Sequence, residues 1–133
     1  MRLPLDDGLK IGIQTIHRQP DEQTGPWLPQ IDELVHFVET VDAAGFDSLW
    51  VGDHLSMPLP FLDPLLMLTQ AAVVSRRLLL GTGVYLLPLR HPGPVAKQVA
   101  TLDHLSEGRF IFGVGIGGEL SLIHISEPTR RTT

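Results

Sequence analysis

Apolar residues occur along the chain in two alternating patterns. Some form short, continuous and often β-branched runs, whereas others recur every three or four residues. A short continuous run is typical of a strand buried on both faces, and the wider spacing is typical of a helix with one apolar face. The runs predict strands near residues 10–16, 48–51, 79–84 and 110–114. The spaced residues predict helices near residues 29–44, 62–75 and 92–106.

Residues that favour helix ends support these boundaries. Asp63 followed by Pro64 suits a helix start, since the carboxylate can cap free N–H groups and proline is tolerated at the first helical position. Gly45 and Gly108 follow the last apolar residues of the first and third helices, where glycine often adopts a left-handed conformation.

The order of these elements predicts an α/β protein with a parallel sheet covered by helices. The strands begin about 30 to 40 residues apart, which is the size of a repeating strand–helix unit. Four such units make either half of a (β/α)8 barrel or a small doubly wound sheet. The chain has 133 residues, which is one domain at most. A complete barrel usually needs about 250 residues.

Composition narrows the possible partners and location. The net charge of −5 argues against nucleic acid, because binding phosphate needs a surplus of lysine and arginine. No apolar run reaches the length that spans a bilayer, and the first residues contain no apolar core of the length found in signal peptides, so we expect none. The absence of cysteine suits a cytoplasmic protein. His17, His36 and His104 show no metal-ligand spacing, so we expect no metal site.

Chemistry in parallel barrels occurs at the carboxyl ends of the strands. Asp53 and His54 directly follow the second predicted strand. A histidine can exchange protons near neutral pH, and a neighbouring carboxylate can orient it. A turn capped by Asp53 with a surface-exposed His54 explains the same pair equally well.

Two glycine-rich segments end the third and fourth strands. Gly81 and Gly83 indicate either close approach of the backbone to a ligand or packing against a neighbouring element. The run 113–118 matches the G-x-G-x-x-G pattern, but it follows the fourth strand rather than the first, so a dinucleotide site is disfavoured. Arg90, His91 and Lys97 flank the start of the third helix, and we expect them to be solvent-facing charges.

The segments at 80–90 and 96–118, together with the Asp-His pair, resemble the third unit and fourth strand of the luciferase-like monooxygenase family. The resemblance implies the N-terminal half of a (β/α)8 barrel that ends after about strand 4. It also implies a flavin- or deazaflavin-dependent oxidoreductase acting on a small organic substrate. Coenzyme F-420 is the favoured cofactor, and FMN with O2 is the alternative. The resemblance further implies a homo-oligomer for a full-length enzyme.

The same resemblance implies roles for particular residues. His54 would take part in substrate proton transfer, and Glu119 would be a second catalytic carboxylate, one position later than in some deazaflavin members. The Gly83–Val84 peptide would be cis and support the ring from behind. The coenzyme-binding residues would be Asp53, Gly83, Val84, Leu86, Gly115, Ile116 and Gly117.

The last residues differ in character from the rest. Ser121–Arg130 resembles the translation of a sequencing adapter, so we expect residues 1–119 to form the barrel portion and residues 120–133 to be an artefactual tail. A natural tail is the alternative. A non-catalytic fragment is therefore a further hypothesis for the function of this chain.

Overall fold

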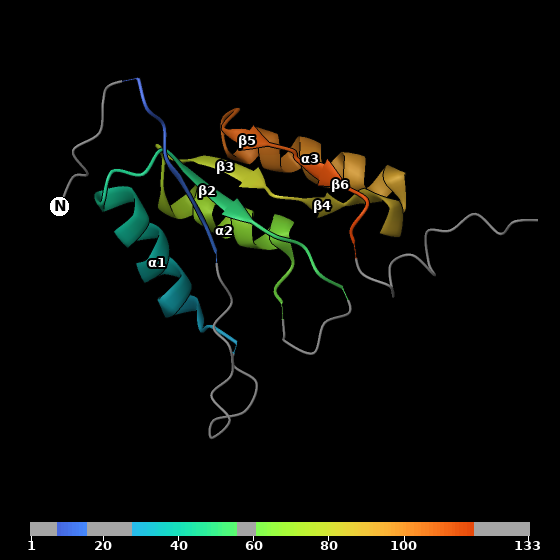
Figure 1. Cartoon of the computed structure of the whole chain (residues 1–133), viewed down its shortest axis with the longest axis horizontal. Coiled ribbons are helices and arrows are strands. Elements are labelled where there is room, and N and C mark those ends of the chain that lie inside the picture. The colour runs from blue at the N-terminus through green and yellow to red at the C-terminus, as the bar shows by residue number, and fades with distance from the viewer. Residues whose placement is uncertain (1–7, 16–27, 56–60, 119–133) are drawn as a thin grey trace, which may run out of the picture.

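Four parallel strands lie side by side in the order in which they occur in the chain (Figure 1). The computed structural model describes residues 8–15, 28–55 and 61–118. The strands of the sheet are β1 (Gly12–Gln14), β2 (Ser48–Val51), β3 (Leu79–Thr82) and β5 (Phe110–Ile111). Every neighbouring pair is parallel.

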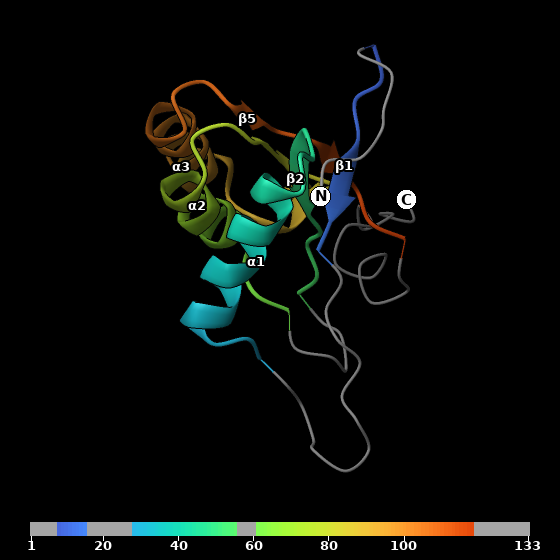
Figure 2. The ribbon, with the colours of Figure 1, turned by 90° about the vertical axis from the view of Figure 1, so that its left-hand side faces the viewer.

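Three helices connect these strands and cover one face of the sheet (Figure 2). They are α1 (Ile31–Ala43), α2 (Pro64–Val74) and α3 (Pro92–Leu105). A doubly wound sheet places helices on both faces and reverses its strand order. Strands in chain order with helices on one face are instead the arrangement of half a (β/α)8 barrel, which confirms that prediction.

The hydrophobic core lies between the sheet and the helices. Leu49 and Val51 of β2 and Leu80 of β3 face the helix layer and are fully or almost fully buried. Leu68 of α2 and Leu78 before β3 are also fully buried against them. Burial of each such side chain is worth about 1.5–3 kcal/mol, so this layer supplies most of the stability.

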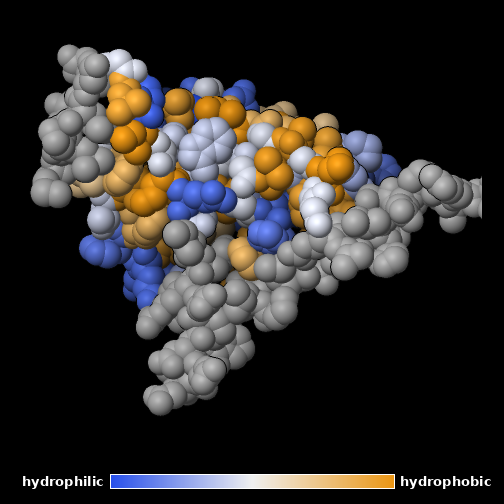
Figure 3. Space-filling model, viewed as in Figure 1, coloured by the Kyte–Doolittle hydropathy of each residue, from blue (hydrophilic) through white to orange (hydrophobic). Residues whose placement is uncertain are grey.

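The opposite face of the sheet has no helix over it in the described part of the chain. Trp50 lies across this face, where it occupies the space left by Gly12 on β1 and Gly81 on β3. Leu79 and Ile111 are partly exposed on the same face. Figure 3 views the molecule from this side and shows hydrophobic surface over the strands.

Two predicted strands are interrupted, which corrects the expected strands at 79–84 and 110–114. β3 ends at Thr82 and β5 ends at Ile111, and the chain then forms a second parallel pair, β4 (Tyr85–Leu86) with β6 (Val114–Gly115). The Gly113 carbonyl lies at the break and accepts hydrogen bonds from the Thr82 hydroxyl at 2.8 Å and the Tyr85 N–H at 2.7 Å. These bonds replace the regular ladder between the two pairs.

The helix ends follow the sequence signals closely. Asp63 caps α2, and its carboxylate accepts from the Leu66 N–H at 3.0 Å. Gly45 and Gly108 have φ values of 85° and 76°, in the left-handed region that glycine tolerates best. The three helices begin and end within two residues of the predicted bounds.

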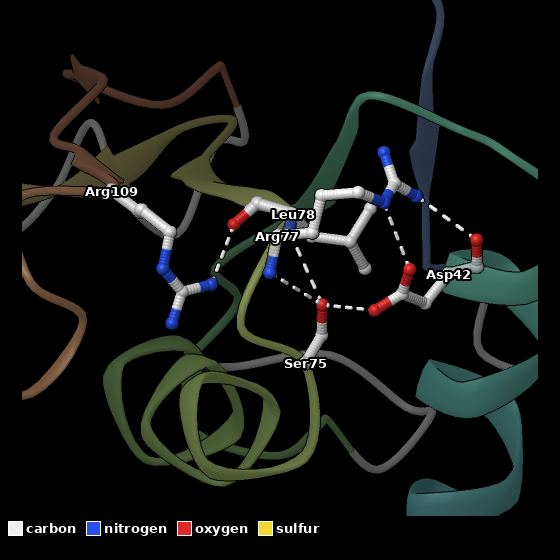
Figure 4. A network of polar contacts seen from close by, with 5 residues as sticks. All are labelled: Asp42, Ser75, Arg77, Leu78 and Arg109. Atoms are coloured by element: carbon white, nitrogen blue, oxygen red, sulfur yellow. Dashed lines mark hydrogen bonds and ion pairs between the residues drawn. The ribbon is translucent and has the colours of Figure 1, made fainter.

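A polar network joins the helix layer to the amino-terminal ends of the strands (Figure 4). Asp42 at the end of α1 accepts from the Ser75 hydroxyl at 2.5 Å and from Arg77 Nε at 2.9 Å. The Leu78 N–H donates to Ser75 Oγ, and Arg109 Nη1 donates to the Leu78 carbonyl at 2.8 Å. The Ser75 hydrogen bond has the largest effect on the pKa of Asp42 and lowers it, Arg77 lowers it further, and burial opposes both.

Candidate functional site

Residues from the carboxyl ends of the parallel strands surround a cavity of about 190 Å³. This edge of the sheet is where parallel barrels bind their ligands. Its lining comes from four separate segments of the chain, which the topology brings together. The lining residues are Gln14, Gly52, Asp53, His54, Gly83, Val84, Leu86, Gly117 and Gly118.

A larger groove of about 330 Å³ lies elsewhere, between α2 and α3. Leucine side chains such as Leu66 and Leu105 line it, together with Lys97. It belongs to the helix layer and lies away from the strand ends. The smaller cavity is therefore the better candidate for chemistry, because it collects backbone, imidazole and amide groups from several strands.

Asp53 is the most buried charged group at this edge, with a side chain only 1% exposed. Its Oδ1 accepts from Arg90 Nη2 at 2.8 Å, and its Oδ2 accepts from the Leu86 N–H at 2.8 Å and from Arg90 Nη1. Both carboxylate oxygens are thus engaged within the protein.

Arg90 is not solvent-facing, and the expectation that it would be is wrong. Its side chain is 16% exposed and forms a two-pronged ion pair with Asp53. The guanidinium also lies 4.3 Å from the centre of the Tyr85 ring. Burial alone would lower the pKa of Arg90, but the hydrogen bonds and charge of Asp53 raise it overall. His91 and Lys97 are exposed, as expected.

His54 is exposed at the cavity, next to the buried Asp53. Its ring packs at a tilt of 48° on Phe61, with 4.3 Å between the ring centres. Nε2 lies 3.9 Å from the place where a Cβ on Gly52 would be, so this nitrogen is close to Gly52 in the cavity lining. An imidazole in this position can exchange protons with a ligand in the cavity.

The Gly83–Val84 peptide is cis, which confirms that prediction. The Gly83 carbonyl accepts from Gln14 Nε2 at 3.3 Å, which links the ends of β1 and β3. Gln14 was not among the site residues predicted from the sequence. A single amide side chain at the end of a strand is a weak signal on its own.

Only some residues of the second glycine-rich segment line the cavity, and others pack against its wall or are exposed. A Cβ on Gly115 would lie 2.6 Å from Val84 Cγ2, so Gly115 packs closely against the cavity wall without lining the cavity. Ile116 is 73% exposed and does not line the cavity either. Gly117, with φ of 78°, does line it. Glu119 lies outside the described residues.

The sequence around Arg90 contains a signal that could have identified it as part of the site. It directly precedes His91, the N-cap residue of α3, where the helix dipole disfavours a positive charge. A positively charged side chain near this helix start is stabilised by an acidic partner nearby. Asp53, at the end of a neighbouring strand, was the candidate.

No group of histidine, cysteine and carboxylate side chains within residues 8–15, 28–55 and 61–118 could hold a metal ion. In the same residues no helix is long and apolar enough to cross a membrane.

Comparison with known proteins shows which sequence family this chain resembles. A sequence model of the luciferase-like monooxygenase family matches residues 9–122. The 4-hydroxyprotoasukamycin monooxygenase of Streptomyces nodosus subsp. asukaensis is 41% identical over 104 residues. That match covers 74% of this chain and 28% of that enzyme.

Solved structures agree on the fold. The coenzyme F420-dependent tetrahydromethanopterin reductase of Methanopyrus kandleri superimposes with a TM-score of 0.67 at 28% identity, covering 90% of this chain and 30% of that one. The oxygenating constituent of 3,6-diketocamphane monooxygenase of Pseudomonas putida, solved with FMN, gives a TM-score of 0.63 at 25% identity, covering 72% and 27%. The chain spans less than a third of the length of each of these proteins.

Proposed function

The chain belongs to the luciferase-like monooxygenase family, and from this premise we propose that it forms one wall of the coenzyme pocket of a deazaflavin-dependent oxidoreductase. The reaction would be hydride transfer between coenzyme F-420 and a small organic substrate. The observation that carries the proposal is the cavity at the strand ends, where His54 faces a wall built largely of glycine backbone.

The residues present fit one face of a flat ring system. Gly52, Gly83, Gly117 and Gly118 line the cavity without side chains, so a planar ring can approach the backbone closely. A Cβ on Gly52 would have neighbours at 3.5 to 3.9 Å and would take up space in the cavity. The volume of about 190 Å³ is below the range of about 300–1,000 Å³ that whole ligand pockets occupy, so these residues cover only part of a coenzyme.

When bound, the deazaflavin would supply the hydride chemistry. The residues of this chain would orient the ring and hold or transfer the proton. His54 would hold or move a proton at the imidazole nitrogen that faces the cavity. The backbone from Gly83 to Leu86 would support the ring from one side and exclude water there.

An FMN-dependent monooxygenase is the second candidate function. The similarity to the FMN-bound camphane monooxygenase constituent favours it. The Asp53–His54 pair and the glycine-rich segment, which resemble deazaflavin members, favour coenzyme F-420. Both candidates use the same cavity, so coenzyme binding separates them.

The test is a titration of the isotope-labelled chain with coenzyme F-420 and with FMN, followed by NMR. Amide signals of Gly52, His54, Gly83 and Leu86 should shift, with a dissociation constant of about 1 mM because one wall alone makes contact. Adenosine monophosphate, which carries a phosphate but no tricyclic ring, is the control. Absence of these shifts with both coenzymes would contradict the proposal, and larger shifts with FMN would favour the second candidate.

A non-catalytic fragment is the alternative to both enzymes. The relatives are about three to four times as long as the matched region, so we expect the source DNA to continue in frame beyond the codon for Glu119 into further strand–helix units. A stop codon directly after Thr133 would favour the fragment instead.

We also propose that the full-length enzyme is a homo-oligomer in the cytoplasm. Leu66 and Val73, two turns apart on α2, are 72% and 71% exposed, with Thr69 and Gln70 between them on the same face. We propose that a second copy of the enzyme covers these two apolar side chains. Sedimentation of the full-length enzyme should show a dimer or larger species, and replacing both residues by glutamate should yield monomer. Fractionation of source cells tests the location.

A further inference from the structure

The guanidinium of Arg90 joins two segments that are far apart in the sequence, one after β2 and one around β4. It donates to both carboxylate oxygens of Asp53, which follows β2, and to the Leu86 carbonyl of β4 at 3.2 Å. Its face packs on the Tyr85 ring. Arg90 itself follows the short 3-10 helix η1 (Leu87–Leu89) and precedes α3.

Asp53 completes this unit from the other side. Its Oδ2 accepts the Leu86 N–H at 2.8 Å, so the Leu86 peptide is held at both its N–H and its carbonyl, the first by Asp53 and the second by Arg90. Removing the guanidinium would leave the carboxylate buried beside a single N–H. A buried charge that loses its partner moves toward water or rearranges its surroundings.

The residues adjacent to this unit line the cavity. His54 follows Asp53 directly, and Leu86 is itself part of the wall. A shift at Arg90 would therefore reach the cavity through two backbone segments. The fork of an arginine fixes such a position better than the single charge of a lysine, because it forms two parallel hydrogen bonds.

We propose that Arg90 is a positioning residue of the coenzyme pocket, which holds the Leu86 wall and the Asp53–His54 segment in register through its two-pronged pair with Asp53. This inference rests on the proposed function. It also gives Asp53 the role of an internal anchor, because both of its oxygens accept hydrogen bonds within the protein.

The test compares Arg90→Met with Arg77→Met in the whole chain. Arg77 forms an arginine–aspartate pair with Asp42 at the other end of the sheet, so the same substitution there controls for a lost ion pair. Hydrogen exchange is followed at the Leu86 amide, which donates to Asp53, and at the Leu80 amide, which donates to the Arg109 carbonyl at 2.9 Å. Coenzyme F-420 and FMN are titrated into each variant.

Arg90→Met should speed exchange at Leu86 by about tenfold relative to Leu80, because only the Leu86 bond depends on the pair. It should also weaken coenzyme binding, whereas Arg77→Met should do neither. Arg90→Lys should restore part of both properties. The double variant Asp53→Asn with Arg90→Met should show nearly the same Leu86 exchange and coenzyme binding as Asp53→Asn alone, since the two residues act as a unit.

Unchanged relative exchange at Leu86 in Arg90→Met overturns the proposal, as does equal weakening of coenzyme binding by Arg77→Met. If the unaltered chain binds neither coenzyme, the proposed function fails on its own. The exchange measurement then still decides whether Arg90 positions the cavity wall.

Discussion

Replacing Gly113 by alanine should destabilise the chain strongly, although this glycine does not line the cavity. The residue lies between β5 and β6, where the backbone passes against β3. A Cβ at this position would be 2.2 Å from the Thr82 carbonyl oxygen. Ordinary contacts begin at 3.4 Å, so the two backbones would have to separate by about 1.2 Å, the difference between these distances. A backbone carbonyl cannot rotate away as a flexible side chain can.

The expected loss follows from two contributions. Forcing an extra carbon into a packed site costs about 1–3 kcal/mol, and a backbone neighbour places this case at the upper end. The separation also strains the hydrogen bonds that the Gly113 carbonyl accepts from Thr82 and Tyr85, each worth about 1 kcal/mol net. We therefore expect a loss of about 3 kcal/mol in the free energy of unfolding, a large share of the about 5–15 kcal/mol of a typical domain.

Urea unfolding followed by tryptophan fluorescence measures this loss. Gly118→Ala is the matched control, because a Cβ there would meet nothing within 4 Å. The same glycine-to-alanine change without a close backbone neighbour should leave the free energy of unfolding nearly unchanged. Unfolding free energies of the two variants within about 0.5 kcal/mol of each other would refute the close-approach reasoning.

Two further predictions concern proton chemistry. In the full-length enzyme, His54→Ala should lower turnover by about 100-fold or more with little change in coenzyme affinity. The exposed control His36→Ala should change neither property. Unaltered turnover in His54→Ala would remove this histidine from the mechanism. The hydrogen bond from Ser75, aided by Arg77, lowers the pKa of Asp42 in the folded state, so its stabilisation is present above the usual value of 3.8 and disappears as pH falls through the lowered value. Asp42→Asn should thus cost about 1 kcal/mol at pH 7 and progressively less as the pH falls below 3.8; a cost that does not change with pH in that range would contradict the assignment.

Much of the fold could be predicted because its signals are local. The cap at Asp63 and the left-handed glycines at 45 and 108 depend on neighbouring residues in the chain, and the structure has them where expected. Parallel strands follow from the continuous apolar runs. No local signal distinguishes half a barrel from a doubly wound sheet. The strand order and the position of all three helices on one face of the sheet show that the fold is half a barrel.

The break in β3 and the position of Arg90 could not be predicted in the same way. Gly81 and Gly83 indicated an unusual strand end, but the carbonyl that replaces the regular ladder belongs to Gly113, which is 31 residues after Thr82. Arg90 finds Asp53 across a separation of 37 residues. Solvent exposure was the ordinary expectation for a charged side chain beside prolines, and tertiary contact overrode it.

The arrangement of the second glycine-rich segment shows how one motif serves two purposes. If the glycines at 113 and 115 were present only for a coenzyme, both would line the cavity. Instead the first meets the Thr82 backbone and the second meets Val84, while Gly117 and Gly118 line the cavity. Gly113 and Gly115 thereby let β6 lie against β4 and form the cavity wall. Gly117 and Gly118 leave that wall accessible to a ligand. Side chains added at 113 or 115 should therefore act through stability, and side chains added at 118, where a Cβ meets nothing within 4 Å, should act through binding alone.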